Sequence, residues 1–269
     1  MTFREEHLSD CVRLYLGDSR EIPPVLDGVL VIVTDPPYGQ SQNTNVRGAG
    51  GLRNVTPPGC GSRAIANVQR ARKAAGGLHS SGIAVEWPDG IIGDDDSFVP
   101  GYWLDIAPRC LFWGAHRFAD RLPPGSWLVW DKVPTGKIRD QGDGEAAWIS
   151  GEQRPLRIFR LLWDGVCVGS AARDEVTAGQ QRVHPTQKPV VLMEWCIRQM
   201  AVPDDHTIFD PFMGAGSTGV AAVHLGHPFV GIEIVPQYFE TACRRISEAL
   251  KQPDLFIERP KPAKQEAFL

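Results

Sequence analysis

The sequence lacks several features that would assign it to common protein classes. No apolar run approaches the ~20 residues of a membrane-spanning helix, and the start of the chain lacks the apolar core of a signal peptide. The six cysteines lie far apart and form no C-x-x-C pair, which argues against disulfides and structural zinc. We therefore expect no metal, no membrane association and a reducing, cytoplasmic location.

The chain also lacks an excess of positive charge. Its net charge of −4 argues against a generally basic nucleic-acid binder. Acidic residues are nevertheless absent between Gly39 and Val85, where the basic residues are Arg47, Arg53, Arg63, Arg70, Arg72 and Lys73. This locally basic stretch predicts contacts with phosphates; the alternative is a solvated loop whose charge is incidental.

Short apolar segments alternate with helical patterns along the chain. This alternation predicts a mostly parallel sheet covered by helices on both faces. Helices are expected from Pro189 to before Pro203, from Ser217 to Leu225 and from Gln237 to about Leu250. Seven strands are predicted, at Val12–Leu16, Val29–Thr34, Cys110–Trp113, Trp127–Trp130, Arg157–Leu162, Thr207–Phe209 and Phe229–Ile232.

Three stretches do not fit this alternation. Residues 39–85 are too long for an ordinary connection and predict a functional loop or disorder. Residues 134–155 are polar and glycine-rich, which predicts a second loop on the same edge of the fold. The proline-containing tail, 252–269, predicts a flexible end.

A glycine-rich turn follows the strand expected at Thr207–Phe209. Residues 212–219 contain G-x-G-x-x-G in front of a predicted helix, and Glu233 ends the next predicted strand. Glycines let a ligand approach the backbone, the helix start presents free N–H groups, and an acid in this place accepts hydrogen bonds from ribose hydroxyls. The turn therefore predicts a nucleotide-like cofactor. Taken alone it would also fit a nicotinamide cofactor, or a turn that only packs a helix on a strand.

A second turn, Asp35-Pro36-Pro37-Tyr38, directly follows the apolar run 29–33. Asp35 is a hydrogen-bond acceptor, proline locks φ, and Tyr38 offers a flat face on which a ring can stack. This combination suits a planar amino compound, although a purely structural turn could also contain two prolines.

The order of these motifs resembles that of a known family. The Asp-Pro-Pro-Tyr turn comes first, the hexapeptide His184-Pro185-Thr186-Gln187-Lys188-Pro189 follows, and the glycine turn comes last. Over most of residues 10–250 the chain resembles the permuted β group of S-adenosylmethionine-dependent DNA amino-methyltransferases, the N6-adenine/N4-cytosine DNA methylase family. The resemblance implies a Rossmann-like class I methyltransferase fold: a seven-stranded, mostly parallel sheet with circularly permuted motif order. It further implies one catalytic domain, 1–269, with DNA-recognition insertions at about 39–85 and 134–182.

The same resemblance implies roles for individual residues. Asp35, Pro36, Pro37 and Tyr38 would hold the amine of the target base, and Thr186 and Lys188 would contact the carboxylate of the cofactor. Asp18 would lie near the cofactor's adenine, with a turn or helix-capping role as its alternative. The full set implied for the cofactor is Asp18, Thr186, Lys188, Asp210, Phe212, Gly214, Gly216, Ser217, Thr218 and Glu233. The basic residues from Arg47 to Lys73 are the candidates for DNA phosphates.

The resemblance implies methyl transfer to the exocyclic amine of a base flipped out of double-stranded DNA. Asp as the first letter of the turn favours adenine N6, with cytosine N4 as the alternative. A nicotinamide-linked oxidoreductase and a non-catalytic DNA-binding module are the more distant alternatives; the first would need more sheet after Glu233. Whether the enzyme is a homodimer, or has a cognate restriction endonuclease as in restriction-modification systems, stays open.

Overall fold

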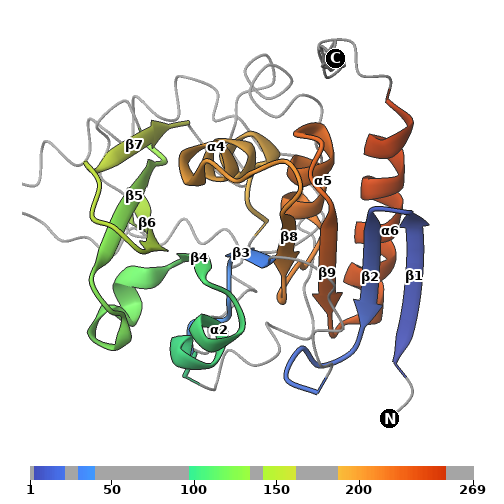
Figure 1. Ribbon diagram of the computed structural model, residues 1–269, viewed down its shortest axis with the longest axis horizontal. Coiled ribbons are helices and arrows are strands. Elements are labelled where there is room, and N and C mark those ends of the chain that lie inside the picture. The colour runs from blue at the N-terminus through green and yellow to red at the C-terminus, as the bar shows by residue number, and fades with distance from the viewer. Residues whose placement is uncertain (1–2, 22–29, 40–96, 134–141, 162–186, 253–269) are drawn as a thin grey trace, which may run out of the picture.

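The computed structural model describes residues 3–21, 30–39, 97–133, 142–161 and 187–252. Within these residues, nine strands form one sheet with helices packed against it (Figure 1). In chain order, the elements are β1 (Arg4–Ser9), β2 (Val12–Leu16), β3 (Leu30–Thr34), α2 (Pro100–Ile106), β4 (Arg109–Trp113), the short 3-10 helices η1 (Ala115–Arg117) and η2 (Ala119–Arg121), β5 (Gly125–Asp131), β6 (Gly144–Ser150), β7 (Arg157–Arg160), α4 (Val190–Met200), β8 (Thr207–Asp210), α5 (Ser217–His224), β9 (Phe229–Glu233) and α6 (Pro236–Lys251).

The sheet is mixed but mostly parallel. Its strand order is β1-β2-β9-β8-β3-β4-β6-β5-β7. All neighbours from β2 to β4 are parallel, as are β5 and β7, whereas β1 and β6 run antiparallel to the strands beside them. The carboxyl ends of every strand except β1 and β6 therefore lie at one edge of the sheet, and the amino end of β6 joins them there.

Two apolar cores lie on the two faces of the sheet. Successive side chains of a strand point to opposite faces, so β3 sends Val31 and Val33 into one core and Leu30 and Ile32 into the other. The first core is shared with α4, α5 and α6, and the second with α2 and the segment around Phe118. A strand covered on both faces has to be apolar throughout, which explains the unbroken run that predicts β3.

The helices expected at 189–202, 217–225 and 237–250 are confirmed as α4, α5 and α6. Pro189 occupies the N-cap of α4, and Ala201, at a φ of 47°, ends the helix just before Pro203. Figure 1 shows α4, α5 and α6 side by side, and the first core contains residues from all three. The α/β class with a largely parallel sheet is therefore confirmed, while the circular permutation stays a prediction.

All seven expected strands are present, and the described residues add two more. The expectation of a loop over 134–155 is wrong for 144–150, which is β6: it pairs with β5 along its whole length, and Ala147 and Trp148 are buried. β1 was not expected because it is a polar edge strand, without the alternation that burial of one face imposes.

The remaining expectations on domain layout are only partly covered. Most of the expected insertion at 39–85 and the tail from 253 lie outside the described residues. Of the insertion expected at 134–182, the structure describes 142–161, where β6 and β7 join the sheet. Among the described helices, none has the length and apolar character needed to cross a membrane.

Candidate functional site

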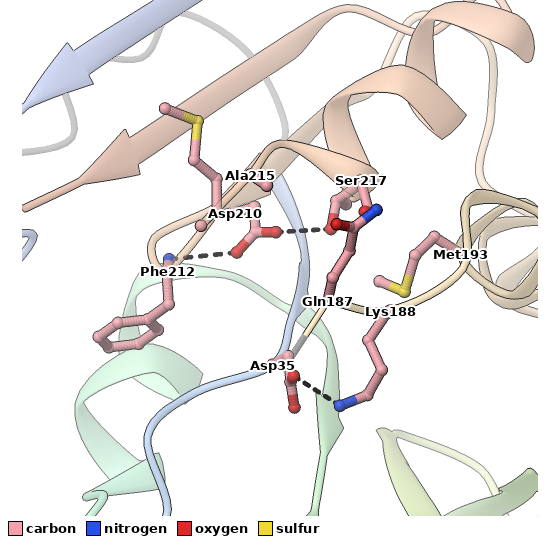
Figure 2. A pocket seen from close by; sticks show the side chains of 11 residues that line it. Asp35, Gln187, Lys188, Met193, Asp210, Phe212, Ala215 and Ser217 are labelled. Atoms are coloured by element: carbon pink, nitrogen blue, oxygen red, sulfur yellow. Dashed lines mark hydrogen bonds and ion pairs between the residues drawn. The ribbon is translucent and has the colours of Figure 1, made fainter. Parts of the chain in front are cut away.

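The carboxyl edge of the sheet brings together the two motifs that lie far apart in the sequence. β3 and β8 are parallel neighbours, and Ile32 pairs with Phe209, so Asp35 after β3 and Asp210 at the end of β8 lie near each other. Both line one pocket, together with the glycine turn and Lys188 (Figure 2). Open α/β sheets bind ligands at this edge, because the loops after the strands converge there.

Asp35 is held by two side chains, one on each carboxylate oxygen. The Nζ of Lys188 lies 2.5 Å from Oδ2 and forms an ion pair with it, and the Tyr38 hydroxyl donates a hydrogen bond to Oδ1. Burial raises the pKa of Asp35, and the charge of Lys188 opposes this effect. Pro36 and Pro37 fix the backbone of the turn, so the carboxylate has little freedom to move.

Lys188 has three oxygen neighbours for its three N–H donors. Besides Asp35, its Nζ lies 3.0 Å from Oε2 of Glu145 and 3.5 Å from the Tyr38 hydroxyl. Burial alone would lower the pKa of Lys188, but the charges of Asp35 and Glu145 outweigh it and raise that pKa well above its usual value. The structure thus pairs Lys188 with the predicted catalytic carboxylate, and its expected contact with the carboxylate of the cofactor stays a prediction.

Tyr38 lies between a glycine and an arginine of the turn that follows β4. Gly114 has a φ of +66°, and a Cβ built on it would lie 2.0 Å from the Tyr38 ring, so only glycine fits here. The guanidinium of Arg117 lies 5.3 Å from the centre of the same ring, within the range of a cation–π contact. Burial raises the pKa of Tyr38 well above its usual value, so the hydroxyl stays protonated and donates to Asp35.

Asp210 anchors the start of the glycine turn. Thr34 Oγ1 donates to its Oδ1 at 2.6 Å, Thr218 Oγ1 donates to its Oδ2 at 2.5 Å, and the backbone N–H of Phe212 also donates to Oδ1, at 3.1 Å. Burial raises the pKa of Asp210 to about 6, although the hydrogen bonds from Thr218 and Thr34 oppose the shift. Its contacts therefore fix the turn between β8 and α5 (Figure 2), and Asp210 also lines the pocket.

The glycine turn has the backbone geometry that its sequence predicts. Gly214 and Gly216 have φ values of 51° and 77°, and Gly216 is the N-cap of α5. Arg245 of α6 donates a hydrogen bond to the carbonyl of Ala215 and so links the turn to α6. Burial lowers the pKa of Arg245 to about 10. Ser217 and Thr218 begin the helix and line the pocket.

Glu233 and Asp18 lie further along the same edge, after the parallel strands β9 and β2. Glu233 is buried, and its Oε1 accepts a 2.8 Å hydrogen bond from the backbone N–H of Val235. Burial raises the pKa of Glu233 to about 7, against nearby backbone N–H groups that favour the ionised form. Asp18 instead binds the guanidinium of Arg20, at 2.7 Å between Oδ2 and Nη2, and its pKa is lowered by this contact.

Asp18 therefore has the turn-forming contacts of its alternative role, because the backbone N–H of Arg20 also donates to its Oδ1 at 2.9 Å. Thr186 and all six basic residues from Arg47 to Lys73 lie outside the described residues. Their predicted contacts with cofactor and DNA stay predictions.

The sequence did not identify Glu145 and Lys132 as site residues. Lys132 follows β5, Glu145 is the second residue of β6, and their side chains form an ion pair. They meet because β5 and β6 pair antiparallel with Asp131 opposite Gly144. Both fell in or beside a stretch expected to be a loop, so no motif pointed to them.

Comparison with known proteins finds one family match and several relatives. Residues 140–244 match the family described as DNA methylase. The type II methyltransferase M2.LlaDCHI of Lactococcus lactis subsp. cremoris is 42% identical over 87 residues, which are 32% of this chain and 30% of the relative. The chain thus spans under a third of the length of the curated relatives it matches.

The solved structures that match the chain are more distant in sequence. The PvuII DNA methyltransferase (cytosine-N4-specific) covers 95% of this chain and 92% of its own, with 15% identity and a TM-score of 0.49. The M1.HpyAVI–SAM complex covers 87% of this chain and 98% of its own, with 19% identity and a TM-score of 0.43. At these identities, residue roles do not transfer from one structure to the other.

Proposed function

From the match of residues 140–244 to the DNA methylase family, we propose that the protein is an S-adenosylmethionine-dependent DNA methyltransferase acting on an exocyclic amine. One observation carries the proposal: the Asp-Pro-Pro-Tyr turn and the glycine turn open into the same pocket, from adjacent parallel strands. An enzyme that joins an amine to a nucleotide-like methyl donor needs the two binding sites side by side.

The residues of the pocket fit this cofactor. Asp35 and Asp210 line it, and carboxylates favour a cationic sulfonium. Gly214 lines the pocket and Gly216 is the N-cap of α5, and both let a ligand approach the backbone. Glu233, at the end of β9 and outside the pocket lining, has a buried carboxylate that would accept hydrogen bonds from ribose hydroxyls. When bound, S-adenosylmethionine supplies the methyl group as an electrophile.

The side chains around Asp35 are better suited to holding the target amine by hydrogen bonds than to forming a covalent intermediate with the base. An exocyclic amine is a weak nucleophile because its lone pair is delocalised into the ring of the base. Asp35 accepts a hydrogen bond from one N–H of the amine, and the carbonyl of Pro36 accepts a hydrogen bond from the other. The nitrogen can then become pyramidal and attack the methyl group. Each Asp35 oxygen has lone pairs beyond those that Lys188 and Tyr38 use. Catalysis then depends mainly on position.

Adenine N6 is the finer part of the proposal. It is supported by Asp35 as the first residue of the turn, since serine is usual there in the cytosine-N4 enzymes that the chain otherwise resembles. Cytosine N4 is the second candidate, because the same acceptors would serve its amine. A nicotinamide-linked oxidoreductase has less support, because Asp210-Pro211-Phe212 before the glycines resembles the methyltransferase motif rather than the dehydrogenase one.

Transfer of labelled methyl from S-adenosylmethionine to unmodified duplex DNA, followed by digestion and mass spectrometry of the nucleosides, tests the proposal. We expect the label in N6-methyladenine and none with Asp35→Ala. Label in N4-methylcytosine would keep the reaction and change the base. Cofactor binding without label on DNA of varied sequence would contradict the proposal. Double-stranded DNA as substrate, a homodimer, a partner endonuclease and a cytoplasmic location belong to the same proposal.

A further inference from the structure

Four charged side chains form a line from the β5–β6 hairpin to the catalytic turn. Lys132, Glu145, Lys188 and Asp35 alternate in sign, and each contacts the next. We call this set the charge chain. Lys132 pairs with Oε1 of Glu145, Lys188 lies 3.0 Å from Oε2 of the same carboxylate, and Lys188 lies 2.5 Å from Oδ2 of Asp35. The chain as a whole is neutral.

All four members are largely shielded from water. Their side chains are 19%, 21%, 7% and 18% exposed, in the order from Lys132 to Asp35. Charges in such surroundings interact strongly, and removing one leaves its neighbours with an uncompensated charge. Burial alone would raise the pKa of Glu145, but Lys188 and Lys132 outweigh it and bring that pKa to about 2. Glu145 is therefore a carboxylate at any working pH.

The sequence motifs predict roles for Asp35 and Lys188 but none for Glu145. On the predicted mechanism Asp35 needs to stay ionised and fixed, and Lys188 is the group that holds it. An ammonium on a four-carbon side chain can take several positions, so it needs a partner of its own. Oε2 of Glu145 lies 3.0 Å from Nζ of Lys188, and Glu145 is on β6, a strand in the interior of the sheet.

We propose that Glu145 is a positioning residue for methyl transfer: it holds Lys188 between two carboxylates, and Lys188 in turn holds the Asp35 carboxylate against the target amine. This inference rests on the proposed function. Lys132 completes the arrangement by balancing the second negative charge. Lys188 hydrogen-bonds to Asp35 and to the Tyr38 hydroxyl and forms an ion pair with Glu145, so protein oxygens surround its ammonium.

A purely structural role for Glu145 makes a different prediction. In that case Glu145 would serve only to neutralise Lys132, and removing both charges together would restore the wild-type protein. The double variant Lys132→Met/Glu145→Gln keeps the cluster neutral and leaves the Asp35–Lys188 pair in place. The double variant therefore separates the effect of leaving Lys132 without a counter-charge from the effect of removing the Glu145–Lys188 contact.

The experiment compares Glu145→Gln, the double variant and the control Glu194→Gln in single-turnover methyl transfer to duplex DNA. Glu194 has a similar exposure, 22%, and a 2.7 Å hydrogen bond with His224, but it does not line the pocket. Melting temperature and the dissociation constants for S-adenosylmethionine and DNA are measured on each. Misplacing a reacting group by about 1 Å can cost on the order of 100-fold in rate, and we expect a loss of this order for Glu145→Gln.

For the double variant, we expect the melting temperature to recover while the rate stays low and both dissociation constants stay unchanged. Recovery of the rate together with the melting temperature would overturn the proposal, as would an equal loss in the Glu194→Gln control. If Glu145→Gln does not fold, the double variant alone decides between these outcomes. Failure of the proposed function is distinct, because the wild-type protein itself would then transfer no methyl to DNA.

Discussion

Replacing Gly216 with alanine should destabilise the protein by an amount that follows from two features of the structure. The φ of Gly216 is +77°, and an L-residue held in this left-handed region costs about 1–2 kcal/mol. In addition, the new Cβ would lie 2.9 Å from the Cβ of Ala242 and 3.1 Å from Cδ1 of Ile246. These neighbours belong to α6 and are fully buried, so they have little room to retreat.

The steric term adds to the conformational one. Overpacking of a well-filled core costs about 1–3 kcal/mol, so the total is about 3 kcal/mol. For a protein of this size, about 2–4 °C are lost per kcal/mol, which predicts a fall in melting temperature of about 6–12 °C. The assay is thermal unfolding followed by circular dichroism, with cofactor affinity measured by calorimetry below the transition. We expect the affinity to fall as well, because the substitution alters the turn that begins α5.

Gly101→Ala is the matched control for this substitution. Gly101 is in α2, its φ is not left-handed, and a Cβ built on it meets nothing within 4 Å. Alanine at such a compatible site stabilises by about 0.4–1 kcal/mol, so the melting temperature should stay or rise slightly. The reasoning is refuted if Gly216→Ala leaves the melting temperature unchanged, or if Gly101→Ala lowers it by the same amount.

Three further predictions concern charge. Lys188→Met should slow methyl transfer and leave the affinity for S-adenosylmethionine intact, because Lys188 pairs with Asp35. Weaker cofactor binding at an unchanged rate would instead support the contact with the cofactor's carboxylate that the sequence predicts. The pKa of Glu233 rises from 4.5 to about 7 on folding, so the native protein binds this proton more tightly than the unfolded chain does. The free energy of unfolding should therefore decrease as the pH rises from 4.5 to 7, by on the order of 3 kcal/mol. Unfolding by urea at several pH values measures this slope, and an equal slope in Glu233→Gln would contradict it. Neutralising the arginines from 47 to 72 should weaken DNA binding and flatten its dependence on salt, whereas an identical slope would show that they do not contact phosphates.

The elements that the sequence predicts well are those whose residues are buried on a regular pattern. β3 and β9 are buried at every position, and α4 buries six of its residues, so their apolar runs stand out. The glycine turn was predictable because a left-handed backbone requires glycine, as Gly214 and Gly216 confirm. In these places, the local residue types alone determine the local structure.

The elements that the sequence misses depend on pairing with distant residues. β1 has a polar sequence and exists because it adds to the edge of β2. β6 begins Gly144-Glu145, which is typical of a loop, and becomes a strand through its partners β4 and β5. The site shows the same limit, since no motif indicates the contacts of Lys188 with Asp35 and Glu145, which require the folded sheet.

The position of β6 explains why the site needs an element that carries no motif. The parallel strands bring Asp35 and the glycine turn to the same edge, but neither motif supplies the second carboxylate that pairs with Lys188. An antiparallel strand at this point presents its amino end at the edge where its neighbours end, and so delivers the early residue Glu145 to the charge chain. A parallel strand would present its last residues there instead. The reversal of direction between β4 and β6 is thus what supplies Lys188 with its second carboxylate, and a variant that shifted the register of β6 by one residue should move Glu145 to the other face and slow methyl transfer as Glu145→Gln does.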